Sequence, residues 1–330
     1  MVNVVITGGG GFLGSRLARE LLAAGSLDVA GEGVQELSGI TLIDQVPAPP
    51  DLAADDRVTA IRGDLGELLA AEVSPLTGAD VIFHLAAAVS GECEADFDLG
   101  IRANLHPTQA LLASARALGT SPVVVFSSSL AVFGNSADHP LPEVVEDQTL
   151  PNPQTSYGAQ KVVGEQLVAD YTRKGFLRGR ALRLVSVSVR PGRPNGAASG
   201  FMSGVIREPL AGQRTTCPVD PATEVALASP AKAIAGLLCA ATAAEAAWGG
   251  RSAVTLPALT VSISEMVAAM TRVAGPEPGT LIDWKPDPVV AEIVATWPAR
   301  VRSERAARLG LTPDPDYDSV IKMHLAESRS

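Results

Sequence analysis

The stretch Val2-Asn3-Val4-Val5-Ile6-Thr7-Gly8-Gly9-Gly10-Gly11-Phe12-Leu13-Gly14 decides the fold of this 330-residue chain. Residues 2–6 are an apolar run rich in β-branched side chains, which predicts a buried strand. Four glycines follow, and leucines at helical spacing beyond them predict a helix that begins near Phe12. A strand, a glycine loop and a helix in this order are the context of a dinucleotide-binding fingerprint.

Three glycines of this loop have separate expected tasks. Gly8 allows a tight turn out of the strand, Gly11 lets a pyrophosphate approach the backbone, and Gly14 lets the helix pack closely on the strand. The free N–H groups at the helix start, around Phe12 and Leu13, and the helix dipole would then hold the phosphates. A merely flexible glycine turn is the alternative, and the flanking strand and helix argue against it.

A second expected strand, 40–44, ends in an acidic residue, Asp44. A carboxylate at this place accepts hydrogen bonds from the adenosine ribose and repels a 2′-phosphate. No Arg or Lys follows within several residues, which favours NAD over NADP as the cofactor. Residues 25–39 are expected to form a loop, and an ordinary strand-end Asp is the alternative interpretation of Asp44.

Further strand-like runs predict a Rossmann-type, doubly wound parallel sheet. They cover residues 58–65, 80–87, 123–126 and 181–187. The carboxyl ends of such strands lie where a dinucleotide binds, so we expect cofactor contacts from their last residues. These are Asp64, Leu65, Leu85, Ala86, Ala87, Ser127 and Val185. His84, inside an apolar strand, is expected to be a hydrogen-bonded core residue.

The alternation of strands and helices changes along the chain. Apolar spacing predicts helices over 101–118 and 157–171, with a proline-rich loop at 138–154 between them. Beyond Pro191 the alternation breaks down, with a helix expected after Ser229 and a strand over 254–259. We expect an NAD-binding Rossmann domain over residues 1–190. A smaller, irregular α/β substrate lobe is expected over residues 191–330.

The composition restricts the classes of partner. The formal net charge of −10 argues against binding to nucleic acid or to an anionic membrane. The alanine-rich stretch 233–247 is too short and too polar to span a bilayer. Three cysteines far apart and without CxxC spacing predict neither a disulfide framework nor a zinc site, and they fit a cytoplasmic protein. Four histidines without ligand spacing support no metal site.

Tyr157 and Lys161 carry the clearest catalytic signal. They are four residues apart, so on a helix they share one face. The tyrosine phenol, with a pKa near ~10, becomes a base when a neighbouring ammonium and a positive nicotinamide ring favour the phenolate. Lowering the pKa by ~3 units requires ~4 kcal/mol. A serine hydroxyl at the end of an adjacent strand would hold the substrate oxygen, whereas an unrelated pair on a helix surface is the alternative.

Four segments together resemble the extended short-chain dehydrogenase/reductase family, that is, the NAD-dependent epimerase/dehydratase group. The segments are 7–14, 84–87, 126–129 and 155–161. The resemblance implies that Ser129 donates to the substrate hydroxyl, that Tyr157 is the acid/base and that Lys161 touches both Tyr157 and the nicotinamide ribose. It also implies that Asn104 belongs to a polar relay. A homodimer, paired through helices 101–118 and 157–173, is implied as well.

Three departures from the family pattern bear on the reaction. Family dehydratases carry Asp-Glu directly after the catalytic hydroxyl residue, whereas this chain has Leu130-Ala131. Many epimerases have Tyr at the position of Phe133. Epimerases often read Arg-x-x-Asn after the sixth strand, and the run here is Arg183-Leu184-Val185-Ser186. The first departure argues against dehydration, and the last removes a group commonly used near a sugar nucleotide.

Other stretches resemble the branch of this family that oxidises D-erythronate, a four-carbon sugar acid. They are 89–98, 188–195, 207–212 and 217–221. The resemblance implies NAD-dependent oxidation of the C2 hydroxyl of a small sugar acid. Two alternatives stay open: an NDP-sugar 4-epimerase or reductase of the same family, and a non-enzymatic dinucleotide sensor. Net formation of NADH separates the first alternative from the dehydrogenase, and the Tyr157–Lys161 pair weighs against the second.

A sugar acid requires a receptor for its carboxylate. A charged carboxylate in a partly dry pocket needs a cation or several N–H donors. We expect the pocket between the tip of the fourth strand, the Ser127–Ser129 tip and the loop after the sixth strand. Ser90 and Gly91 offer a hydroxyl and a backbone N–H there. Of the two loop arginines, Arg190 and Arg193, the sequence favours Arg193, and a solvated surface charge is the alternative for either.

Overall fold

A parallel β-sheet forms the centre of the computed structural model, which describes residues 1–192 and 199–328. Its strands pair side by side in the order β12-β8-β6-β5-β1-β3-β4, all parallel. The short strand β2 (Ser26–Asp28) pairs antiparallel with the start of β3. The bounds are β1 Val2–Thr7, β3 Val34–Asp44, β4 Val58–Arg62, β5 Val81–His84, β6 Val123–Ser129, β8 Arg178–Leu184 and β12 Val254–Thr255.

The strand order reverses between β1 and β5. From β1 the chain proceeds to β3 on one side, and from β5 it proceeds to β6 on the other. The loops that leave Thr7 and His84 therefore diverge and open a crevice at the carboxyl edge of the sheet, which is where ligands bind in this fold. The predicted doubly wound parallel sheet is thus confirmed.

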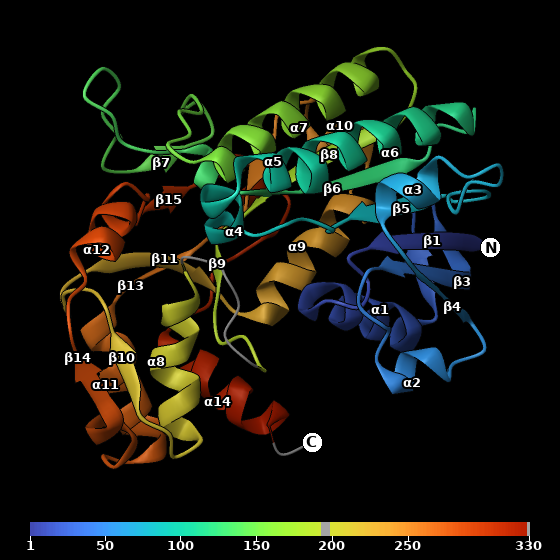
Figure 1. Cartoon of the computed structure of the whole chain (residues 1–330). Helices are drawn as coiled ribbons and strands as arrows, with labels where there is room; N and C mark the ends of the chain where they lie inside the picture. Colours follow the sequence, from blue (N-terminus) through green and yellow to red (C-terminus); the bar gives the residue numbers. More distant parts are fainter. Residues whose placement is uncertain (193–198, 329–330) are drawn as a thin grey trace.

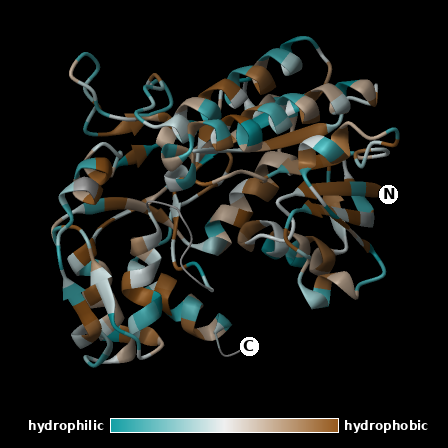
Figure 2. Cartoon of the chain, in the orientation of Figure 1, coloured by the Kyte–Doolittle hydropathy of each residue, from teal (hydrophilic) through white to brown (hydrophobic). Residues whose placement is uncertain are grey.

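Helices cover both faces of this sheet (Figure 1). On one face α1 (Phe12–Ala24) packs beside α9 (Pro230–Thr242). On the other lie α3 (Leu65–Leu69), α6 (His106–Ala117) and α7 (Ser156–Arg173). Three short helical segments precede α6: α4 Ser90–Ala95, α5 Phe97–Gly100 and a π-helical segment Ile101–Leu105. The central strands are strongly apolar (Figure 2), as expected for a sheet buried on both faces.

A second lobe has a separate hydrophobic core. One of its sheets joins β9 (Ser186–Val187) in parallel to β11 (Glu224–Ala228), and β11 is antiparallel to β13 (Leu259–Ser262). A smaller sheet pairs β10 (Thr215–Cys217) with β14 (Ile282–Trp284). Its helices are α8 Gly200–Leu210, α11 Ile263–Ala274, α12 Pro288–Ala295 and α14 Tyr317–Glu327. The remaining elements are α2 Pro50–Ala53, β7 Val145–Glu146, α10 Glu245–Trp248, β15 Val301–Arg302, α13 Glu304–Arg308 and two 3₁₀ segments, Leu130–Val132 and Pro278–Leu281.

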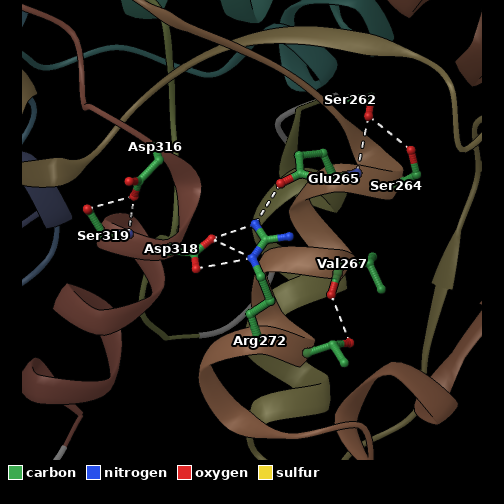
Figure 3. A network of polar contacts seen from close by, with 9 residues as sticks. Ser262, Ser264, Glu265, Val267, Arg272, Asp316, Asp318 and Ser319 are labelled. Carbon is green, nitrogen blue, oxygen red and sulfur yellow. Dashed lines mark hydrogen bonds and ion pairs between the residues drawn. The ribbon is translucent and has the colours of Figure 1, made fainter.

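Ion pairs on the surface of the second lobe connect α11 to α14. Figure 3 shows the Arg272 guanidinium between two carboxylates, Glu265 of its own helix and Asp318 of α14. The Arg272–Asp318 and Arg272–Glu265 distances are both 2.6 Å. Because exposed pairs of this kind contribute ~1 kcal/mol or less, the apolar core beneath them holds the two helices together.

The two cores are not separated at one point of the sequence. Helix α9 and strand β12 lie beyond residue 190 and nevertheless join the larger core, since β12 extends the main sheet beside β8. The chain enters the second lobe at Val185, where β8 ends and β9 begins. The division into residues 1–190 and 191–330 stays a prediction, with these two elements returning to the first core.

Several expected element bounds differ from the structure. Residues 25–39 contain the β2–β3 hairpin rather than a loop. The fourth expected strand ends at His84, three residues early. The runs 181–187 and 254–259 each divide into two strands that belong to different sheets, because the chain passes between the cores there. The segment 138–154 is irregular except for β7, which pairs with β15.

Candidate active site

A cavity of about 960 Å³ lies at the carboxyl edge of the main sheet and extends to the second lobe. It is lined by the glycine loop, the ends of β3 to β6 and β8, the start of α7, and residues of α8, β11 and α12. Nearly all the site residues expected from the sequence lie in this lining. They are Gly8, Gly11, Phe12, Leu13, Gly14, Asp44, Asp64, Leu65, Leu85, Ala86, Ala87, Ser90, Gly91, Ser127, Ser129, Tyr157, Lys161 and Val185.

The glycine loop leaves no room for side chains, as Gly8 and Gly14 show. Gly8 has φ +74°, and a Cβ there would lie 2.8 Å from the Ala86 nitrogen. A Cβ on Gly14 would lie 2.1 Å from the Gly8 carbonyl oxygen, a distance that no real structure tolerates. The first helical turn therefore packs directly against the loop that precedes it, which is the close approach expected of Gly14.

The N-terminus of α1 faces the cavity without a capping side chain. Gly11 is the N-cap residue, and the first turn has no acidic side chain. The Ser15 N–H bonds to the Gly11 carbonyl, whereas the N–H groups of the preceding turn have no intrahelical acceptor. These groups and the helix dipole suit a pyrophosphate, so the residues present fit NAD.

Asp44 is fixed at the end of β3 by backbone donors. Its Oδ2 accepts from the Gly10 N–H at 3.0 Å, and its Oδ1 accepts from the Val46 N–H at 3.1 Å. This geometry turns the carboxylate to the glycine loop, where a ribose would lie. Arg62 stands opposite Asp44 in the β3–β4 register, and its Nε donates to the Gln45 carbonyl at 3.0 Å. A cation therefore stands beside Asp44, although none follows Asp44 closely in the sequence.

The other expected cofactor contacts are held by local hydrogen bonds. Asp64 caps α3, where its Oδ1 accepts from the Gly66 N–H at 2.9 Å, and its Oδ2 accepts from the Gln45 side chain. The Ser127 hydroxyl donates to the His84 carbonyl at 3.0 Å. His84 itself is 2% exposed and bonded at both ring nitrogens, to the hydroxyls of Thr7 and Thr108, which confirms it as a core residue.

Helix α7 presents Tyr157 and Lys161 to the cavity on one face. The Thr155 hydroxyl caps the helix by accepting from the Gly158 N–H at 3.1 Å. Lys161 is 4% exposed, and its Nζ donates to the Ser127 carbonyl at 2.8 Å. The ammonium lies 5.5 Å from the centre of the Tyr157 ring. Ser129, at the end of β6, is hydrogen-bonded to Tyr157.

Burial controls the ionisation of this pair. Removal from water raises the pKa of Tyr157 to about 12, and the hydrogen bond from Ser129 and the charge of Arg190 oppose the rise. Burial also lowers the pKa of Lys161 to about 8, opposed by the nearby Cys93 and Glu165. The phenol is therefore protonated at neutral pH when only these side chains surround it. The stabilisation of ~4 kcal/mol expected for the phenolate is not supplied by Lys161 alone.

A buried ion pair fixes α7 against the sheet behind Tyr157 and Lys161. Glu165, one turn beyond Lys161, accepts from Arg183 of β8 at 2.8 and 2.7 Å, a bidentate geometry. Its Oε1 also accepts from the Ser128 hydroxyl at 2.5 Å. Since both partners are less than 8% exposed, removing one would leave a buried charge unpaired. Arg183 is the first residue of the run 183–186, where this chain departs from the Arg-x-x-Asn pattern of epimerases. Its guanidinium is therefore bound to Glu165.

Asn104 lies behind the cavity wall and outside its lining. Its side-chain oxygen accepts from the Ala88 N–H at 2.7 Å, and its amide donates to the Ala88 carbonyl and to Gln160 of α7. The same amide lies 3.2 Å from the Cys93 sulfur. In this structure Asn104 therefore joins the segment after β5 to α7, so we treat it as a positioning residue.

The structure describes one of the two loop arginines, Arg190. Arg193 lies outside the described residues. Arg190 lines the cavity, and its Nη1 is buried without a hydrogen-bond partner. Its backbone is held by α8: the N–H donates to the Ser203 hydroxyl at 3.0 Å, and the carbonyl accepts from Arg207 at 2.8 Å.

The second lobe contributes lining residues that sequence reasoning missed. Helix α8 contributes Met202, Ser203 and Arg207, and β11 contributes residues 224–226. Helix α12 and the turn after it add an apolar wall of Ile293, Val294, Trp297 and Pro298. Apart from Arg207, which lies in the stretch 207–212 noted above, no local sequence signal marks them, because they meet the main sheet only through the packing of the second core.

Two further properties of the described residues concern partners. No helix within 1–192 and 199–328 has the length and apolar character needed to cross a membrane. Over the same ranges, no group of three or more His, Cys, Asp or Glu side chains is arranged to hold a metal ion.

Comparison with known proteins places the chain in a family. Residues 4–233 match the model of the NAD dependent epimerase/dehydratase family. The D-erythronate dehydrogenases of Cupriavidus necator and Haemophilus influenzae are 47% and 36% identical to this chain, and each alignment covers at least 98% of both chains. The crystal structure of a nucleoside-diphosphate-sugar epimerase from Agrobacterium tumefaciens has a TM-score of 0.88 at 35% identity, covering 99% of this chain and 94% of that one.

The chain belongs to the NAD-dependent epimerase/dehydratase family, as the sequence motifs predicted. Within that family it is an NAD-dependent dehydrogenase, similar over nearly its full length to the curated D-erythronate dehydrogenases. NAD is its cofactor, and the glycine loop and the exposed start of α1 fit that group.

Proposed function

We propose that this protein oxidises the C2 hydroxyl of a small sugar acid, D-erythronate, to give 2-dehydro-D-erythronate. One observation carries the proposal: the cavity that begins at the glycine loop continues without a break past Ser129, Tyr157 and Lys161 into the second lobe. Cofactor and substrate can therefore meet at the tyrosine. The identity of 47% to a D-erythronate dehydrogenase extends over both lobes and supports this choice of substrate class.

NAD, when bound, supplies the acceptor for the hydride that leaves C2. The residues of this chain handle the proton. Ser129 holds the C2 oxygen against the Tyr157 phenol, and Tyr157 removes the hydroxyl proton as the carbonyl forms. Lys161, anchored on the Ser127 carbonyl, keeps a positive charge beside the phenol and favours its ionised form.

Arg190 adds a second positive charge near Tyr157, and this charge lowers the pKa of the phenol. The Arg190 charge and the Ser129 hydroxyl act against the effect of burial, which alone would keep the proton on the phenol. This balance is the reason that we assign proton removal to Tyr157 rather than to His84, whose ring is enclosed in the core.

An NDP-sugar 4-epimerase is the second candidate, favoured by the similarity to the Agrobacterium tumefaciens structure. An epimerase returns the hydride within one turnover and releases no NADH. The experiment is therefore a panel of C4 and C5 aldonates, UDP-glucose and UDP-galactose with NAD, followed by NADH absorbance and by product analysis. NADH formation with D-erythronate supports the proposal. Interconversion of the sugar nucleotides without NADH would contradict it.

A homodimer and a cytoplasmic location stay predictions. The dimer would pair α6 and α7 of two subunits in a four-helix bundle, and these two helices lie side by side on one face of the sheet (Figure 1). A monomer mass by light scattering at micromolar concentration would count against the dimer.

A further inference from the structure

We propose that Arg190 is the receptor for the substrate carboxylate, and that Ser203 and Arg207 of α8 hold it in place. This inference rests on the proposed oxidation of a sugar acid and adds to it the group that selects for the acid. The sequence favoured Arg193 for this task, and Arg193 lies outside the described residues, so the proposal rests on the contacts of Arg190 alone.

One nitrogen of the Arg190 guanidinium has no partner among the described residues. Its Nη1 is shielded from solvent and bonded to nothing in the described part of the chain. No ion pair among the described residues involves Arg190. A buried N–H donor without an acceptor is costly, by roughly 1–3 kcal/mol. A ligand that brings an acceptor into the cavity would remove this cost.

The other cations in the cavity lining already have partners. Lys161 donates to the Ser127 carbonyl. Arg207 donates to the Arg190 carbonyl at 2.8 Å and to the Glu208 carboxylate at 2.5 Å. Among the described lining residues, this leaves Arg190 as the cation with an uncommitted donor.

Helix α8 fixes the backbone of Arg190 at both of its polar groups. The N–H donates to Ser203, which is 1% exposed, and the carbonyl accepts from Arg207. Glu208 holds the Arg207 side chain in turn. The guanidinium therefore projects from a backbone that is set before any substrate binds, and such preorganisation lowers the entropy cost of binding.

The position of Arg190 suits the geometry of a 2-hydroxy acid. In such a substrate the carboxylate is attached directly to the carbon that is oxidised, so its receptor must lie close to the catalytic phenol. The Arg190 charge is close enough to Tyr157 to lower the pKa of the phenol. A planar guanidinium matches the two oxygens of a carboxylate, which an ammonium does not.

The test compares D-erythronate with D-erythronamide, which has the same carbon chain and no charge. In the wild type we expect a much lower KM for the acid. Arg190→Met should raise the KM for the acid about 10- to 100-fold, as expected for charged hydrogen bonds, and leave the KM for the amide nearly unchanged. Arg190→Lys should recover only part of the difference, because the fork is lost.

Two controls separate binding from folding. The affinity for NAD, measured by fluorescence titration, should stay unchanged in Arg190→Met. Arg214→Met removes an arginine of the second lobe that lies outside the cavity lining and pairs with Asp283, so its KM values should equal those of the wild type. If Arg190→Met does not fold, Arg190→Lys and Ser203→Ala serve in its place. Both keep the positive charge, and both should still change the ratio of the KM for the acid to the KM for the amide.

Calorimetric titration of D-erythronate into the enzyme–NADH complex tests the receptor without turnover. Loss of binding in Arg190→Met supports the inference. An unchanged acid-to-amide ratio and unchanged binding in Arg190→Met would overturn it, as would a large effect of Arg193→Met alone. If the wild type forms no NADH from any aldonate, the proposed function fails. The titration then tests the assignment of Arg190 separately. If the wild type shows no measurable binding of the acid, that assignment is overturned too.

Discussion

The two walls of the cavity are built in different ways. On the side of the main sheet, backbone geometry dominates: the glycine loop, the ends of parallel strands and the open start of α1. On the side of the second lobe, side chains from α8, β11 and α12 form the lining. A backbone that must approach a ligand closely demands glycine, whereas a side-chain lining can be built from many residue types. The residues of the first wall could therefore be predicted from the sequence, whereas those of the second could not.

The largest expected effect concerns Tyr157, where the two walls meet. Tyr157→Phe removes the proton acceptor and leaves the ring in place, so kcat should fall by about 10³-fold, with the affinity for NAD nearly unchanged. Steady-state rates and a fluorescence titration with NADH measure both. Near-normal turnover in this variant would remove Tyr157 from the mechanism.

The pH dependence of kcat/KM shows whether Lys161 or Arg190 is the cation that titrates. The value of kcat/KM reports the free enzyme, in which the pKa of Tyr157 is raised to about 12 and that of Lys161 is lowered to about 8. The phenolate fraction grows about tenfold per pH unit, and the Lys161 charge is lost above its pKa. The oxidation rate should therefore rise up to about pH 8 and flatten above it. Arg190 remains charged throughout and produces no such break. A profile without a change of slope between pH 7 and 9 would contradict the role of Lys161.

Cofactor choice tests the sheet-side wall alone. Asp44→Ala removes the carboxylate that we propose for the ribose, and Arg62, its partner in the β3–β4 register, then remains. We expect the NAD-to-NADP ratio of kcat/KM to fall about 10- to 100-fold, corresponding to about 1.4–2.7 kcal/mol. The double variant Asp44→Ala/Arg62→Ala should show less activity with NADP than Asp44→Ala alone. If the ratio stays constant in the single variant, Asp44 does not select the cofactor.

A matched pair of glycine substitutions compares the walls directly. Gly14 and Gly204 both lie inside helices, but an added Cβ meets the Gly8 carbonyl oxygen at 2.1 Å in the first case and only Glu208, at 3.5 Å, in the second. Gly14→Ala should lower the free energy of unfolding by about 1–3 kcal/mol and weaken NAD binding.

Gly204→Ala should instead stabilise the protein by about 0.5–1 kcal/mol, because alanine favours the helix. Thermal unfolding of both variants gives the comparison. Equal effects would show that the sheet-side loop is no more tightly packed than the second lobe.

The sequence predicted the parallel sheet because its strands are continuous apolar runs. It did not predict the β2–β3 hairpin, since the first half of β3 alternates exposed polar residues such as Glu36 and Ser38 with less exposed ones. It also placed the start of β8 three residues late, because Arg180 is charged. Arg180 is nevertheless buried, where the carbonyls of Ala240 and Ala243 accept from its guanidinium.

The proximity of Tyr157 and Lys161 was easier to predict than that of the residues proposed for carboxylate binding, for a similar reason. Tyr157 and Lys161 lie one helical turn apart, so their proximity follows from the sequence alone. Arg190 and Ser203 come together only because α8 packs on the loop after β9. The proposal for Arg190 depends on that long-range contact, and no local pattern contained it.

The position of hydride transfer tests the central claim most directly. D-erythronate that carries deuterium at C2 is incubated with the enzyme and NAD, and the reduced cofactor is examined by mass spectrometry and NMR. Oxidation at C2 predicts deuterium at the nicotinamide C4 position and a slower initial rate than with unlabelled substrate. Formation of unlabelled NADH from this substrate would place the oxidation at another carbon and contradict the account.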